Sequence, residues 1–284
     1  MRLPALFLLF AAAGFPAGPI KVLLIDGQNN HDWKATTPLL KKMLEASGLF
    51  AVDVATTPPK GGDMTQFKPH FSAYGAVLSN YTGDPWPDGV RKAFEAYVGN
   101  GGGFVVYHAA NNAFPEWREF NLMTGLGGWG KRGASAGPYL RFRDGKVFTE
   151  DTPGRAGHHG KQHPFQVVHR DLGHPITRGL PEKWMHVQDE LYDSMRGPAV
   201  NITLLATAWS DPATGGTGEH EPVLFTVAYG KGRVFHTMLG HGPDAIACAG
   251  FQTTLLRGAE WAATGAVTQK PPADFPGEAE TRVR

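Results

Sequence analysis

The sequence is poor in cysteine and in net charge, and each shortage excludes a class of function. Cys248 is the single cysteine among 284 residues, so an intramolecular disulfide and a thiolate metal cluster are both excluded. Its neighbours predict a turn that leads into a helix, which favours a small buried side chain over a nucleophile. The formal net charge is +1 and no basic block is present, so we expect no nucleic-acid partner. Small polar ligands are the expected partners.

Long hydrophobic runs are also missing, and we expect no integral membrane span in the mature chain. Residues 1–18 carry one positive charge, then a short apolar stretch, then small residues and proline. This layout is typical of a secretory signal peptide and is too short to cross a bilayer comfortably. The alternatives are a frayed tail or a retained lipid-facing anchor. We therefore predict export, to the periplasm or beyond, after signal-peptide cleavage.

What the sequence does contain is a regular alternation of strands and helices in its first half. The expected strands are 21–26, 50–55, 74–79 and 104–107, and the expected helices are 36–47 and 86–99. This alternation is typical of parallel βαβ units. Beyond residue 125, short strands among glycine-rich loops precede a final helix at 251–264. We predict one α/β domain over 19–268 and a loosely ordered tail over 269–284.

Polar residues stand at the ends of four expected strands. His31 follows the first strand, His108 the fourth, Glu190 a later strand and His241 the last core strand. Because the carboxyl ends of parallel strands line the ligand crevice of an open sheet, we expect these side chains to share one site. His236 lies within the last strand, and alternation predicts that it faces elsewhere.

The chemistry of this site has two interpretations. The histidines and the carboxylate are suitable ligands for a divalent metal cation, and the candidate ligands are His31, His108, His159, Glu190 and His241. The same residues also suit a metal-free polar pocket for a sugar, with Trp33, Tyr81 or Trp129 stacking on its ring. The candidate substrate-binding residues are Asp32, Trp33, Tyr81, Asn111 and Asp189. Asp32 is equally suited to capping the helix that follows it.

Seven segments, in chain order, resemble the trehalose-utilisation (ThuA-like) family of the class I glutamine amidotransferase-like superfamily. They are His-Asp-Trp at 31–33, Tyr-His-Ala-Ala-Asn at 107–111, His-Pro-Ile-Thr-Arg-Gly-Leu-Pro at 174–181, Asp-Glu-Leu-Tyr at 189–192, Gly-Lys-Gly-Arg-Val-Phe at 230–235, Leu-Gly-His at 239–241 and Arg-Gly-Ala-Glu-Trp-Ala at 257–262. The resemblance implies a flavodoxin-like three-layer α/β sandwich with a mostly parallel sheet and an inserted mixed-strand region. It also implies a link to carbohydrate metabolism through the handling of sugars or their 3-keto forms.

The leading hypothesis is an exported enzyme that isomerises or cleaves a sugar or keto-sugar by acid–base chemistry, with a metal as a further option. His241 and Glu190 would form the proton-transfer pair, and His108 would be a further catalytic residue. Glutamine amidotransferases carry a Cys at the turn that His108 occupies here, so we expect no glutaminase activity. The alternative is a non-catalytic carbohydrate-binding or accessory module.

Overall fold

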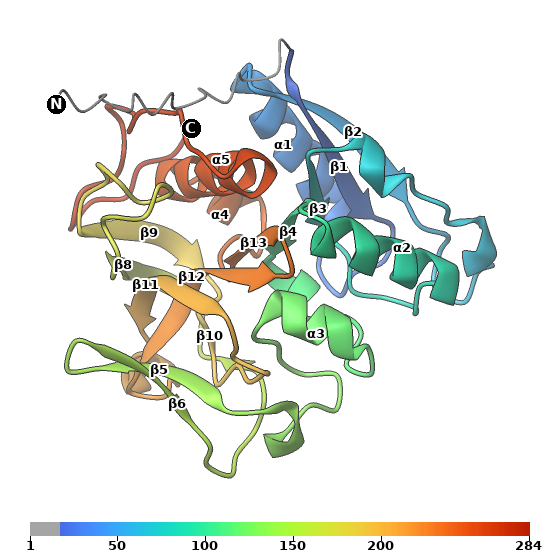
Figure 1. Cartoon of the computed structure of the whole chain (residues 1–284). Helices are drawn as coiled ribbons and strands as arrows, with labels where there is room; N and C mark the ends of the chain where they lie inside the picture. The colour runs from blue at the N-terminus through green and yellow to red at the C-terminus, as the bar shows by residue number, and fades with distance from the viewer. Residues whose placement is uncertain (1–17) are drawn as a thin grey trace, which may run out of the picture.

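A nine-stranded sheet organises the protein in the computed structural model, which describes residues 18–284 (Figure 1). The strand order is β2-β1-β3-β4-β13-β12-β11-β8-β9. The first five strands in this order pair in parallel and are β1 (Ile20–Asp26), β2 (Phe50–Thr56), β3 (Ala76–Ser79), β4 (Gly103–Tyr107) and β13 (Gly232–Thr237). The predicted α/β fold is confirmed, and its parallel strands carry the continuous apolar runs expected when both faces of a sheet are covered.

The other half of the sheet is antiparallel and contains the inserted region. Its strands are β12 (His220–Tyr229), β11 (Ile202–Trp209), β8 (His163–His169) and β9 (Lys183–Asp189). Two small sheets accompany it: β5 (Tyr139–Arg143) with β6 (Lys146–Glu150), and β7 (His158–His159) with β10 (Tyr192–Asp193). Part of the inserted mixed-strand region therefore extends the parallel sheet, and the rest forms these two small sheets.

Helices cover both faces of the sheet, as Figure 1 shows. One group contains α1 (Trp33–Ala46), α4 (Pro243–Ala247) and α5 (Ala249–Thr264), and the other contains α2 (Asp88–Gly99) and α3 (Arg118–Thr124). Consecutive residues of β13 show the two faces. Phe235 packs on Gly258 of α5, where a Cβ would overlap the phenyl ring, whereas His236 bonds the carbonyl of Thr124 in α3.

The two ends of the chain bear on two predictions. The predicted signal peptide falls on residues 1–18, of which 1–17 lie outside the described residues. In the rest of the chain, no helix combines the length and the apolar character that crossing a membrane requires.

The C-terminal segment 269–284 differs from the loosely ordered tail expected from its charge and proline content. Its Phe275 ring lies 5.6 Å from the ring of Trp184, and the carbonyl of Arg282 accepts a hydrogen bond from the amide of Ala249. One aromatic residue and several backbone contacts therefore fix the segment against α5 and β9, which composition does not reveal.

Candidate metal centre and its cavity

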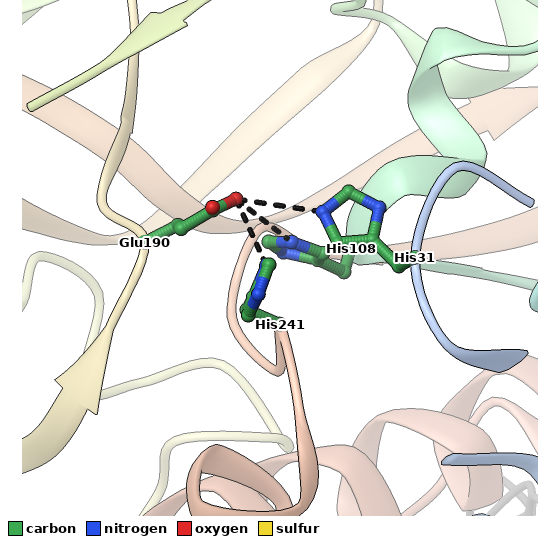
Figure 2. A group of neighbouring side chains, drawn as sticks. All are labelled: His31, His108, Glu190 and His241. Atoms are coloured by element: carbon green, nitrogen blue, oxygen red, sulfur yellow. Dashed lines mark hydrogen bonds and ion pairs between the residues drawn. The ribbon is translucent and has the colours of Figure 1, made fainter. Parts of the chain in front are cut away.

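Four side chains from distant segments converge at the carboxyl edge of the sheet (Figure 2). His31 follows β1, His108 follows β4, Glu190 follows β9 and His241 follows β13. Each offers one ligand atom, and these atoms all lie within 4.8 Å of one another. We call these four residues the His/Glu cluster. The structure thus brings together the polar strand ends that the sequence indicated.

The spacing within the His/Glu cluster suits a small cation. Oε2 of Glu190 lies 3.0 Å from Nδ1 of His241, 3.5 Å from Nε2 of His31 and 3.6 Å from Nε2 of His108. In a tetrahedral zinc site with Zn–N distances of about 2.1 Å, neighbouring ligand atoms lie about 3.4 Å apart. The observed separations bracket that value, so the donor set and its geometry fit a divalent metal.

Hydrogen bonds at the far side of two rings fix which nitrogen faces the carboxylate. Nδ1 of His108 donates to the carbonyl of Met238 at 2.7 Å, so Nε2 carries a lone pair, and this buried atom has no hydrogen-bond partner. Nδ1 of His31 lies 3.4 Å from Oδ1 of Asn29, and its Nε2 lies within hydrogen-bond distance of Oε2 of Glu190, at 3.5 Å. Three imidazoles thus crowd one carboxylate, an arrangement that a proton or a metal ion between the nitrogens and the oxygen would stabilise.

The electrostatics of the cluster follow from burial and from this crowding. Burial would raise the pKa of the Glu190 carboxyl, but the imidazoles of His108, His241 and His31 outweigh it and hold the pKa well below its usual range. Burial lowers the pKa of His31, whereas the bond to Glu190 raises the pKa of His241. Glu190 is therefore a carboxylate at neutral pH, as a metal ligand must be.

His108 has a positive φ, which is uncommon for a residue other than glycine. Its φ is +43°, at the point where β4 turns into a short 3₁₀ segment, and its side chain is buried. The ring of Tyr192 stacks on it at 4.3 Å. A left-handed non-glycine residue at a strand end costs conformational free energy, and such strain is concentrated at functional sites.

Asp189 was expected to contact substrate, and the structure corrects this expectation because the side chain is buried. Its carboxylate accepts hydrogen bonds from the backbone amides of Glu190, Gly240 and His241, and from Nε2 of His186 at 2.8 Å. Burial would lower the pKa of His186, but Asp189 raises it to about 9. Asp189 therefore holds the two loops that carry Glu190 and His241.

A cavity of about 620 Å³ opens next to the cluster. Three other residues named from the sequence line it, and they are Asp32, Trp129 and His159. Five further lining residues were not anticipated, and they are Asn30, Thr82, Asn112, Gly130 and Tyr192. A signal existed for Tyr192, which belongs to the Asp-Glu-Leu-Tyr segment at 189–192, and for Thr82, which follows the end of β3.

His159 lies at the edge of the cluster rather than within it. Its Nδ1 donates to the carbonyl of Gly160 at 2.9 Å, and its Nε2 lies 3.5 Å from Oε1 of Glu190. Asp32 is exposed at the cavity and also caps α1, because its Oδ1 accepts from the amide of Ala35 at 3.1 Å. Both interpretations of Asp32 are therefore compatible with the structure.

Three other predicted residues do not reach the cavity. Tyr81 is fully buried, with its ring packed on Trp86 and Phe114 at 5.9 and 5.8 Å, so it cannot stack on a ligand. Asn111 is also buried, and its Nδ2 donates to Nε2 of His236 at 3.1 Å. Trp33 is half-buried at the start of α1 and does not line the cavity.

Fold and site together define an α/β protein with a mixed sheet and a histidine–carboxylate cavity at the carboxyl ends of its parallel strands. The ThuA family model, described as trehalose utilisation, matches residues 21–262, and the chain belongs to this family. The chain is similar to a ThuA-like protein from Parabacteroides merdae, with 52% identity over 94% of this chain and 98% of that chain and a TM-score of 0.92. No match was found among curated proteins.

More distant structures share the fold alone. A ThuA-like protein from Bacteroides uniformis is 18% identical over 93% of this chain and 99% of that chain, with a TM-score of 0.59. A cytoplasmic protein from Salmonella typhimurium is 15% identical over 86% of this chain and 99% of that chain, with a TM-score of 0.51.

The Salmonella protein contradicts the prediction of export, because a protein of this fold is named as cytoplasmic. The prediction depended on one positive charge and a short apolar stretch at 1–18. That pattern is weak without a clean small-residue cleavage motif. We therefore correct the prediction and do not include export in the functional assignment.

Proposed function

We propose that this protein is a metal-dependent enzyme that isomerises or cleaves a sugar or keto-sugar in the cavity beside the His/Glu cluster. The observation that carries the proposal is the convergence of three imidazoles on the carboxylate of Glu190, with Nε2 of His108 buried and without a hydrogen-bond partner. The family description, trehalose utilisation, supports a carbohydrate as the substrate.

The residues divide into ligands and groups that contact substrate. His31, His108, Glu190 and His241 would hold the cation, and a divalent metal there would act as a Lewis acid toward a sugar oxygen. In this proposal Glu190 and His241, predicted as a proton-transfer pair, act as ligands, because they belong to the group of four side chains that could hold a metal ion. Among the described residues, His159 is the one histidine outside the cluster that lines the cavity. Its Nε2 can exchange a proton with substrate.

The proposal is tested by metal content and turnover together. We expect the purified full chain, exposed to Zn²⁺ or Mn²⁺ and then desalted, to retain about one metal ion per chain by mass spectrometry. Glu190→Gln should lose the metal and all turnover of a panel of disaccharides and their 3-keto forms. The matched control is Glu182→Gln, an exposed glutamate in the turn before β9.

Two results would contradict the proposal. A wild-type chain that retains no divalent metal would remove the metal centre, and an unaltered metal content in Glu190→Gln would remove Glu190 as a ligand. Binding of sugars with full metal content but without turnover of any of them would favour the carbohydrate-binding module instead.

A further inference from the structure

Trp129 lines the cavity with a half-buried indole, and its position is fixed by its own backbone. Its φ is +50°, in the left-handed region that aromatic residues rarely adopt. Its amide donates to the carbonyl of Ala156 at 2.8 Å, and its carbonyl accepts from the amide of Arg132 at 2.8 Å. The conformational cost of this turn is offset by contacts that hold the half-buried ring at the cavity.

The indole is also supported from behind. A Cβ at Gly157 would lie 2.7 Å from both Cε3 and the amide nitrogen of Trp129, so a side chain there would displace the ring. The edge of the indole packs on Tyr192 at 4.7 Å, and Tyr192 stacks on His108 of the His/Glu cluster. Tyr192 therefore lies between Trp129 and the ligands of the His/Glu cluster.

The remaining cavity wall is polar but lacks positive side chains. Within residues 18–284, neither Lys nor Arg lines this cavity, whereas the neutral side chains of Asn30, Thr82 and Asn112 do. Asp32 adds a negative charge. Phosphate groups are normally bound by arginine, lysine or a helix N-terminus. Neither of these side chains lines the cavity, and the N-terminus of α1 is capped there by the carboxylate of Asp32, which would repel a phosphate.

We propose that the cavity binds a neutral, unphosphorylated pyranose sugar whose apolar ring face stacks on Trp129 while its hydroxyls bond the surrounding amide and hydroxyl side chains. The C–H face of a pyranose is apolar and its rim is polar, which matches one indole wall bordered by Asn30, Thr82 and Asn112. The proposal rests on the proposed function for the choice of a carbohydrate, and it adds the charge of the sugar and the residue that orients it.

The test is calorimetric titration of the metal-loaded full chain with trehalose, 3-keto-trehalose, methyl α-glucoside and trehalose 6-phosphate. We expect at least one neutral sugar to bind at least tenfold more tightly than the phosphorylated one. Trp129→Ala should weaken that binding at least tenfold without changing the metal content, and Trp129→Phe should recover part of the loss. Trp209→Ala is the matched control, because Trp209 is 47% exposed and lies outside the cavity.

Three results would overturn this inference: binding of none of the neutral sugars, tighter binding of trehalose 6-phosphate, or wild-type affinity in Trp129→Ala. These failures are distinct from failure of the proposed function. A metal-loaded chain that binds neutral sugars through Trp129 but converts none of them would remove the enzyme assignment and leave the sugar subsite intact.

Discussion

The histidines of the cavity and those of the sheet interior differ in what their ring nitrogens meet. In the interior, Nδ1 of His236 donates to the Thr124 carbonyl and Nε2 accepts from Asn111. His169 is satisfied in the same way, by the Pro181 carbonyl and the indole N–H of Trp184. The rings of His236 and His169 therefore each pair one donor with one acceptor, as buried polar groups normally do.

At the cavity, Nε2 of His108 has no hydrogen-bond partner, although Oε2 of Glu190 lies 3.6 Å from it. The ring nitrogens of His31 and His241 converge on the same carboxylate oxygen. Burial alone therefore does not distinguish a ligand from a structural histidine, because His108 and His236 are both buried. What distinguishes them is that Nε2 of His108 has no hydrogen-bond partner, whereas Nε2 of His236 accepts from Asn111.

The largest effect is expected when one imidazole ring is removed from each group of histidines, those at the cavity and those in the sheet interior. We expect His108→Ala to weaken metal binding at least 100-fold and to abolish turnover, because one of four ligands is lost. His169→Gln should bind metal as the wild type does. Titration with Co²⁺, followed by its visible absorption, measures both affinities, and equal affinities in the two variants would contradict the ligand assignment.

A smaller effect is expected one step away from the ligands. Asp189→Asn should weaken metal binding 10- to 100-fold, because the loops that carry Glu190 and His241 lose a common acceptor. Asp193→Asn is the matched control. Asp193 is equally buried, but its carboxylate accepts from His158, Ser194 and Ser210 rather than from the cluster loops.

The same Co²⁺ titration distinguishes the roles of the Asp189 and Asp193 carboxylates. If both variants lose metal affinity to the same extent, Asp189 has only a general role in stability. Thermal unfolding of both variants provides the necessary comparison, since similar losses of stability with different metal affinities would support the positioning role.

The smallest effect concerns an interior histidine alone. Burial lowers the pKa of His169 to about 4, from 6.5 as the ordinary value. Between these values the unfolded chain binds a proton that the folded chain does not, so this residue makes stability fall as pH falls from 6.5 toward 4. The contribution reaches at most about 1.4 kcal/mol per pH unit. Urea unfolding at pH 7 and pH 5 measures this loss of stability. We expect the free energy of unfolding to decrease less between the two pH values for His169→Gln than for the wild type, and equal decreases would refute this prediction.

Strand ends were the part of the site that sequence could predict. His108 directly follows a parallel strand with a clear apolar run, and His31 and His241 come a few residues after two others. The carboxyl ends of such strands meet at one edge of the sheet, which brings the three side chains together. Glu190 follows β9, which is the outermost strand of the antiparallel half. Its arrival at the same point depends on the order of the inserted strands, which no local pattern specifies.

The errors in the substrate-binding residues have a common cause. In the turn after β3 the sequence favoured Tyr81, but Thr82 lines the cavity, and in the turn after β4 it favoured Asn111, but Asn112 does. Each prediction is displaced by one residue. Outside a strand, side-chain direction depends on turn dihedrals, and those are set by packing on Trp86 and Met238 rather than by the sequence of the turn itself.

The position of the His/Glu cluster also links metal binding to folding. Its ligands follow strands that include the first and last core strands and that lie in both halves of the sheet. The ligands therefore meet only when the long-range pairing of strands is complete. A cation that binds the assembled ligands and not the unfolded chain adds its binding free energy to the stability of the whole domain. At a free concentration 100 times its Kd, that addition is about 2.7 kcal/mol. The supply of metal would then set the amount of folded protein that a cell retains as well as the turnover rate of the protein.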